Sequence, residues 1–210
     1  MTNNDDFIVD NLDDNVPKKK RIKCGQKGKR GERELVKTLN TRFAKLLAEN
    51  PKWGSFSRSV GSGNRWGQKV VLSETASQVY SGDLTCPDNF KFVIESKAGY
   101  NDIDLFGIFS NKCQGLDEFL KQASDEGGRT GRKPLLIWKK DRKETVAFIK
   151  NIDLPFNVDP FPFLTPAIFY GEWIAVSLSS LLDSTTDEFW FKSDEYSVSS
   201  STIQLEPVAG

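Results

Sequence analysis

The chain has 210 residues, with 29 basic and 29 acidic side chains, 38% hydrophobic residues, three cysteines and no histidine. The lack of histidine excludes Ser-His-Asp and Cys-His catalysis and histidine-ligated zinc, so catalysis would need carboxylates, lysine, serine, tyrosine or an oxygen-ligated metal ion. No apolar run approaches membrane-spanning length, the first residues are acidic, and the cysteines are widely spaced. These features predict a cytoplasmic protein of one domain, with reduced thiols and without a membrane segment or secretory signal.

The zero net charge conceals an uneven distribution of charges. Residues 1–17 carry five acids and no base, and residues 151–210 carry nine acids and one base. The segment 18–150 therefore holds 28 basic and 15 acidic residues, a net charge of +13. A basic body between acidic ends is typical of proteins that bind nucleic acid, although a solvated charged surface would have the same composition.

Hydrophobic periodicity predicts two main helices. Apolar residues recur every three or four positions over residues 29–49, which indicates an amphipathic helix. A second pattern of this kind covers residues 115–126, and Gly127 and Gly128 are expected to end that helix. A shorter helix is expected near residues 177–182.

Short runs rich in β-branched and aromatic residues, bounded by turn residues, predict the strands. They cover residues 55–60, 80–86, 90–98, 134–138 and 145–149, with a further pair of strands within 167–192. With the helices, this order predicts an α/β fold in which a mixed β-sheet is flanked by helices.

The same patterns divide the chain into a core and its surroundings. Residues 1–27 are expected to form a disordered tail with an acidic run followed by a basic run. The core is expected over residues 28–150, interrupted by an irregular insert at 63–81. Residues 151–192 are expected to pack on this core as an extension, and residues 193–210 to form a polar tail.

Two carboxylates and one lysine fall on strands that are expected to be neighbours. A turn between the strands places Asp83 near Glu95, and Glu95 and Lys97 share a face because they are two residues apart. A carboxylate within an apolar strand is costly unless it is paired or bound to a metal ion. The group therefore predicts a Mg²⁺ site, since Mg²⁺ takes oxygen ligands. An ion pair on an exposed strand face is the alternative.

Glu32 leads the apolar stripe of the first predicted helix. Leu35, Val36 and Leu39 follow it at three, four and seven residues, so Glu32 lies on the face that turns toward the sheet. A first-turn acid favoured by the helix dipole would occupy the same position. Beside Asp83, the better interpretation is a third carboxylate of the metal site.

The chemistry that these residues predict is metal-assisted hydrolysis of a phosphodiester. Asp83 and Glu95 would hold Mg²⁺, for which Mn²⁺ could substitute, and the ion would lower the pKa of a bound water. Lys97 would orient that water or stabilise charge on the phosphate. Glu32 would hold a metal-bound water or a second metal ion.

These residues resemble the archaeal Holliday junction resolvases and their phage relatives, within the PD-(D/E)XK nuclease superfamily. The resemblance covers roughly residues 27–150. It rests on the motifs at residues 27–36 (KGKRGERELV), 58–62 (RSVGS), 83 (D) and 94–97 (IESK). It implies a restriction-endonuclease-like fold, with Glu32, Asp83 and Glu95 as metal-site residues and Lys97 as the catalytic lysine. Gly82 takes the place of the proline that often precedes the aspartate.

The resemblance also implies how DNA would be bound. Arg33 and Arg58 would contact phosphates near the scissile bond, and Ser62 matches a loop serine implicated in catalysis in some relatives. Enzymes of this family act as homodimers on branched DNA and recognise the shape and backbone of a four-way junction. Further DNA contacts are expected from Lys29, Arg30, Lys139 and Lys140.

The resulting hypothesis is a magnesium-dependent endonuclease that resolves Holliday junctions, encoded by a phage for recombination or for debranching DNA before packaging. Two alternatives remain open at this point. One is a restriction-, repair- or exonuclease-like enzyme acting on linear or flapped DNA. The other is a non-catalytic protein that binds branched DNA.

Overall fold

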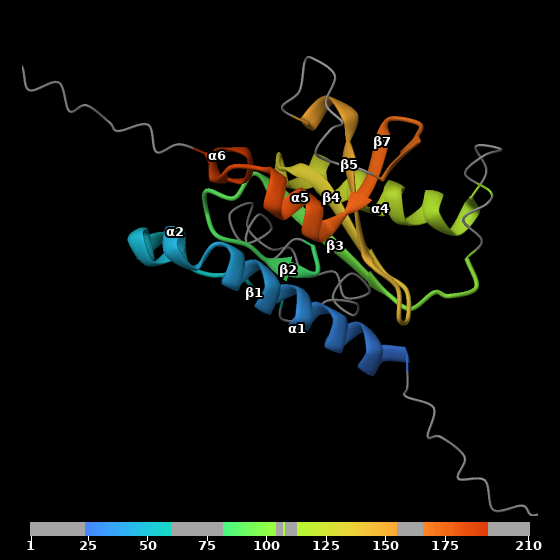
Figure 1. Cartoon of the computed structure of the whole chain (residues 1–210), viewed down its shortest axis with the longest axis horizontal. Helices are drawn as coiled ribbons and strands as arrows, with labels where there is room; N and C mark the ends of the chain where they lie inside the picture. Colours follow the sequence, from blue (N-terminus) through green and yellow to red (C-terminus); the bar gives the residue numbers. More distant parts are fainter. Residues whose placement is uncertain (1–23, 60–81, 104–106, 108–112, 155–165, 193–210) are drawn as a thin grey trace, which may run out of the picture.

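The computed structural model describes residues 24–59, 82–103, 107, 113–154 and 166–192 (Figure 1). Several predicted features lie outside the described residues: the tails at 1–23 and 193–210, the insert at 63–81, residues 155–165 of the extension, and Ser62. No helix in the described part of the chain is long and apolar enough to cross a membrane.

A mixed β-sheet of five strands forms the centre of the fold, in the order β3-β4-β5-β7-β6. The strands are β3 (Phe92–Ala98), β4 (Lys133–Lys139), β5 (Thr145–Lys150), β6 (Ala167–Tyr170) and β7 (Trp173–Ser177). β3 and β4 are parallel, and the other neighbours are antiparallel. Parallel neighbours need a long crossover, which here contains helix α4 (Gln114–Thr130). The prediction of a restriction-endonuclease-like α/β fold is confirmed.

Helices cover both faces of the sheet. Helix α1 (Cys24–Arg42) and helix α5 (Leu178–Ser184) pack on one face, and α4 packs on the other (Figure 1). Alternate residues of β4 show the two sides, since Leu135 belongs to the α1 cluster and Leu136 to the α4 cluster. Strands buried on both faces read as continuous apolar runs, as the sequence of β4 does.

Aromatic residues join the end of α1 to the C-terminal part of the described chain. The Phe43 ring lies within 6.5 Å, centroid to centroid, of the rings of Phe56, Phe90, Trp190 and Phe191. Trp190 ends helix α6 (Asp187–Trp190), and its side chain is fully buried. The C-terminal residues 166–192 therefore supply two strands of the sheet and part of the central core.

The first predicted helix is two helices in the structure. α1 begins earlier than expected, at Cys24, and ends at Arg42, and α2 (Ala44–Glu49) continues after Phe43. Phe43 leaves helical geometry, with φ −102° and ψ 15°, as its side chain enters the aromatic cluster. Backbone hydrogen bonds from Phe43 to Leu39 and from Leu47 to Phe43 span the break.

The predicted end of the second helix is wrong. Gly127 and Gly128 lie inside α4, which continues to Thr130 and ends at Gly131, where φ is 64°. A Cβ atom on Gly127 would lie 3.0 Å from the Arg132 carbonyl oxygen, so glycine here serves close packing. Left-handed geometry at the residue after the helix makes Gly131 the actual terminator.

The predicted hairpin between residues 80–86 and 90–98 also differs from the structure. The short strand β2 (Leu84–Thr85) pairs with β1 (Ser57–Arg58) in a separate two-stranded antiparallel sheet. Its connection to β3 is the hydrogen bond from the Asp83 N–H to the Ile94 carbonyl oxygen, 3.0 Å. The described residues also form two short 3-10 helices, η1 (Pro51–Trp53) and η3 (Asn151–Asp153).

Candidate active site

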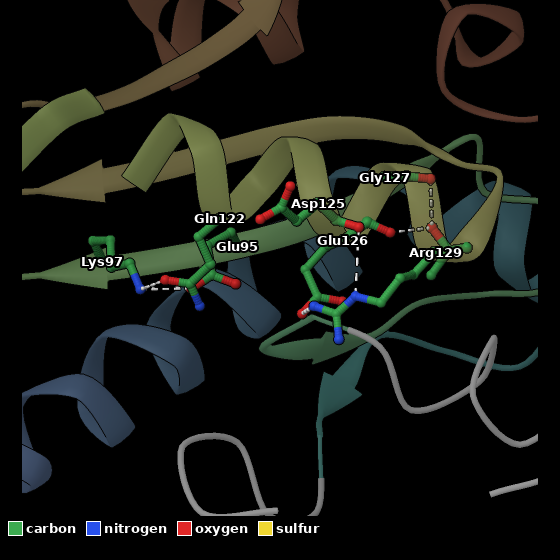
Figure 2. Close-up of polar contacts among 8 residues, drawn as sticks. Glu95, Lys97, Gln122, Asp125, Glu126, Gly127 and Arg129 are labelled. Carbon is green, nitrogen blue, oxygen red and sulfur yellow. Dashed lines mark hydrogen bonds and ion pairs between the residues drawn. The ribbon is translucent and has the colours of Figure 1, made fainter. Parts of the chain in front are cut away.

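Strand β3 is an edge strand of the five-stranded sheet, and it carries Glu95 and Lys97 on the face that α4 covers. The Lys97 Nζ donates to Glu95 Oε1 at 2.6 Å and to Gln122 Oε1 on α4 at 2.8 Å (Figure 2). It also lies 5.2 Å from the centre of the Phe119 ring. Glu95 is only 2% exposed. The lysine ammonium is thus fixed between a carboxylate, an amide oxygen and an aromatic face.

Asp83 lies along the edge of β3, beside the same two residues. Its backbone N–H donates to Ile94, and its Oδ2 accepts a hydrogen bond from the Ser96 N–H at 2.9 Å. The Ser59 N–H donates to the Asp83 carbonyl oxygen at 3.1 Å and ties this segment to β1. The aspartate is therefore positioned by main-chain bonds on both of its sides.

Gly82 explains the missing proline of the motif. Its φ is 79°, which proline cannot adopt because its ring holds φ near −65°. A Cβ atom at this position would lie 2.7 Å from the Ile94 carbonyl oxygen. Glycine therefore lets the chain approach β3 closely enough for Asp83 to reach its position.

The carboxyl groups of Asp83 and Glu95 affect each other's ionisation. Burial raises the pKa of Glu95 to about 7, and the Asp83 charge adds to this rise. Burial also raises the pKa of Asp83, against the lowering effect of its hydrogen bond from Ser96 and of the Lys97 charge. The two side chains lie close enough to share a hydrogen bond. Two buried carboxylates this close favour a shared proton or a bound cation at neutral pH.

Glu32 approaches the pair from the opposite face of the sheet, on α1. It is 8% exposed, and the Arg58 Nε donates to its Oε2 at 2.5 Å. Its charge acts on Asp83. The close approach of α1 to β3 depends on Gly31, since a Cβ atom there would lie 2.9 Å from Ala98 Cβ. The structure thus brings Glu32, Arg58 and Asp83 into one neighbourhood.

The three predicted metal-site acids do not form a closed cage. Among the described residues, no group of three acidic, thiol or imidazole side chains gathers closely enough to enclose a metal ion. Asp83 and Glu95 supply two neighbouring carboxylates for a metal ion, whereas Glu32 forms an ion pair with Arg58. Two carboxylates suit Mg²⁺, which usually keeps several water ligands.

The residues expected to bind DNA fall into two groups. Lys29, Arg30 and Arg33 are exposed on α1, and Arg30 forms an ion pair with Glu34. Lys139 is the last residue of β4, and Lys140 follows it. The Lys139 Nζ lies 4.0 Å from Glu34, close to α1. The Lys140 Nζ donates to the Ile103 carbonyl oxygen at 2.5 Å and lies 5.2 Å from the Trp138 ring centre, so this ammonium is engaged within the fold.

Polar residues of α4 were missed in the sequence. Gln122 contacts Lys97, and Glu126 is a buried acid that forms an ion pair with Arg129 (Figure 2). Glu126 follows Phe119 and Ala123 at helical spacing, so it lies on the apolar face of the predicted helix. An acid on that face could have indicated a buried polar residue near the site. The crossover from β3 to β4 also requires this helix to cover the face that carries Glu95.

An aspartate beside a Glu-x-Lys strand, at the edge of a mixed sheet flanked by helices, defines a nuclease of the PD-(D/E)XK type. A family model described as "Phage putative PDDEXK endonuclease" matches residues 23–160, and the chain belongs to this family. No curated protein and no solved structure matches the chain. The match spans α1, β1, β2, β3, α4, β4 and β5, so it includes every residue placed at the site above.

Proposed function

We propose that this nuclease is a Mg²⁺-dependent, homodimeric endonuclease that resolves four-way DNA junctions, serving recombination or debranching of phage DNA. The observation that carries the nuclease chemistry is the buried Asp83–Glu95 pair beside Lys97 at a sheet edge. The choice of junctions is supported by the motifs at residues 27–36 and 58–62. It is also supported by the exposed bases Lys29 and Arg33 of α1, which suit a phosphate backbone.

Asp83 and Glu95 would hold the metal ion. Their raised pKa values reflect two buried carboxyl groups that are costly to ionise together, and a divalent cation offsets that cost. When bound, the ion supplies Lewis-acid activation of the phosphate and a water of lowered pKa, and Mn²⁺ can serve as well as Mg²⁺. The donor set consists of carboxylate oxygens, which these hard cations prefer.

The chain's own residues orient the reactants. Lys97 has three N–H donors, and its bonds to Glu95 and Gln122 leave the ammonium directed at the acidic pair, where it holds the attacking water or a phosphate oxygen. Arg58, oriented by Glu32 and 25% exposed, binds a phosphate oxygen at the scissile bond. Gln122 and Phe119 of α4 contact Lys97 and cover the site on one side.

Cleavage of a synthetic four-way junction, compared with a linear duplex of the same arm sequence, tests this function. We expect Mg²⁺-dependent nicks in two opposing strands of the junction, resolved by labelling each strand separately. Equal cleavage of the linear duplex would assign the enzyme to the restriction- or repair-like class. Tight junction binding without cleavage in Mg²⁺ or Mn²⁺ would assign it to non-catalytic DNA-binding proteins.

Mg²⁺ is expected to stabilise the folded protein. At a concentration one hundred times its Kd, the ion should raise the free energy of unfolding by about 2.7 kcal/mol. For a chain of this size that corresponds to a rise in Tm of roughly 5–10 °C. Thermal unfolding with Mg²⁺ and with EDTA measures the shift.

The matched controls for this measurement replace single carboxylates. Asp83→Asn should lose the Mg²⁺-dependent rise in Tm, whereas Glu49→Gln, at an exposed position of α2, should keep it. A full rise in Tm in Asp83→Asn would show that Mg²⁺ binds elsewhere and would contradict the assignment of this aspartate.

A further inference from the structure

Helix α4 carries a second pair of a buried acid and an arginine next to the site. Glu126 is 4% exposed, and its carboxylate accepts a hydrogen bond from Arg129 Nη2. The Arg129 Nε donates to the Asp125 carbonyl oxygen at 3.4 Å. The Arg129 side chain nevertheless remains 43% exposed. The guanidinium is therefore held at one end by the helix while much of its side chain stays in contact with solvent.

This arrangement resembles the Glu32–Arg58 pair on the opposite face of the sheet. In both cases a helix supplies a nearly buried glutamate, and an arginine that is partly exposed pairs with it. The charge of Glu32 raises the pKa of Asp83, and the charge of Glu126 raises the pKa of Glu95, in each case after the larger effects of burial and of Lys97. Each carboxylate of the active-site pair thus lies within reach of the charge of one of these two helix glutamates.

The Glu126–Arg129 pair lies on α4 beyond Gln122, toward the end of the helix. Gln122, which contacts Lys97, and Glu126 are four residues apart and share a face of α4. Figure 2 shows the contacts of Lys97, Glu95 and Gln122, and then those of Glu126 and Arg129, one after the other along this helix. Four residues advance about 6 Å along the helix axis. A nucleic acid strand rises about 3.4 Å per nucleotide, so this offset spans one or two nucleotides.

A pair of this kind contributes little to stability, which points to a role outside the fold. Burying a carboxylate is costly, and a buried ion pair is often no more stable than apolar residues of similar volume. An arginine fixed by a carboxylate presents its planar fork in one orientation, which suits a phosphate group. Because the Arg129 side chain is 43% exposed, part of it is accessible to a DNA backbone.

We propose that Arg129, positioned by Glu126, binds a DNA phosphate one or two nucleotides from the scissile phosphate, on the α4 side of the active site. Arg58 serves the α1 side. The inference rests on the proposed nuclease function, and it extends the DNA interface from α1 to the last turn of α4.

A charge-neutral double variant tests this inference. Glu126→Gln/Arg129→Gln removes both charges together, so it leaves no unpaired buried carboxylate and does not alter the net charge of the protein. Junction binding is measured by fluorescence anisotropy over a range of salt concentrations, with Ca²⁺ in place of Mg²⁺ to keep the DNA intact. We expect Kd to rise about tenfold at low salt, and the slope of log Kd against log salt concentration to fall by about 0.9, as for one lost phosphate contact.

The control is Lys45→Gln/Glu49→Gln, which removes another ion pair, i to i+4, from the exposed surface of α2. It should change neither Kd nor the salt slope. If the parent protein binds and cuts DNA but the Glu126/Arg129 variant has an unchanged Kd and salt slope, the role of Arg129 is overturned and the proposed function is not. A parent that neither binds nor cuts DNA would instead overturn the proposed function.

A second variant covers the case in which the double variant fails to fold. Arg129→Lys keeps the positive charge and loses the planar fork. We expect the salt slope to remain that of the parent, and Kd to rise several-fold because the phosphate loses its bidentate partner. An affinity equal to that of the parent would overturn the proposal.

Discussion

Glu95→Gln is expected to abolish DNA cleavage, with a loss of roughly 10³-fold or more in the single-turnover rate. The substitution keeps the shape of the side chain and removes one of two carboxylates assigned to the metal ion. It also weakens the acceptor that holds the Lys97 ammonium at 2.6 Å. Metal-ion stabilisation of the transition state is worth several kcal/mol, and each 1.4 kcal/mol corresponds to a factor of about ten in rate. Strand-resolved junction cleavage measures the loss.

Junction binding separates this effect from misfolding. In Ca²⁺ or EDTA, the Glu95→Gln variant should bind the junction at least as tightly as the parent, because one negative charge next to the DNA is gone. Cleavage within tenfold of the parent would contradict the role of Glu95.

The same variant should be more stable than the parent at alkaline pH without metal ions. The pKa of Glu95 is about 7 in the folded protein, above its ordinary value of 4.5, so the folded state keeps a proton that the unfolded state has lost. This residue therefore makes the parent less stable as pH rises from about 4.5 to 7, by at most about 3 kcal/mol. Glutamine cannot ionise and does not contribute this loss.

Urea unfolding in EDTA measures that difference. The two proteins should have similar free energies of unfolding near pH 4.5, and the variant should be the more stable one at pH 8. Equal stability of the two proteins at both pH values would show that ionisation of Glu95 does not lower the free energy of unfolding. A gain in stability together with a loss of activity is expected where a site keeps charges that the fold alone would not favour.

The sequence was sufficient to predict the part of the site that depends on local geometry. Glu95 and Lys97 share a face because side chains alternate along a strand, and Glu32 faces the sheet because helical residues repeat every 3.6 positions. Both statements need only a few neighbouring residues. The mixed sheet followed from the order of the elements, which the structure confirms.

The contributions of α4 to the site could not be predicted from local patterns. Gln122 contacts Lys97, 25 residues away in the chain, and this contact depends on how the crossover places the helix on β3. Gly127 misled the prediction of the helix end because its role is to pack against the Arg132 carbonyl oxygen. Such contacts arise from packing between elements, where local propensity is overridden.

The position of β7 in the sheet could not be predicted from local patterns either. A strand pair in residues 167–192 was expected, but its hydrogen bonding to β5, in the same sheet as the active-site strand, is a long-range feature. The family match ends at residue 160, before β6 and β7 begin. The stability of the nuclease core therefore depends on residues beyond the matched segment, and the aromatic cluster around Trp190 offers a direct test.

Trp190→Ala is expected to lower the free energy of unfolding by about 3–5 kcal/mol, as large-to-small changes of buried aromatic residues do. Trp190 is fully buried, and its ring lies 5.9 Å from those of Phe43 and Phe90. Its Nε1 donates to Thr185 Oγ1 at 2.8 Å, a bond that the variant also loses. Urea unfolding measures the cost.

Phe169→Ala is the matched control, because this aromatic residue of β6 is 56% exposed. It should change stability by no more than about 0.5 kcal/mol. If Trp190→Ala costs as little as the control, the C-terminal residues are an appendage, and a chain ending at residue 160 should fold alone. If it costs several kcal/mol but still cuts DNA below its lowered Tm, the cluster supports the sheet on which Glu95 and Lys97 lie and takes no part in the chemistry. We expect the second result, because Phe43 directly follows α1, the helix that carries Glu32, and Phe90 lies two residues before β3. The cluster around Trp190 therefore joins the two elements that position the site.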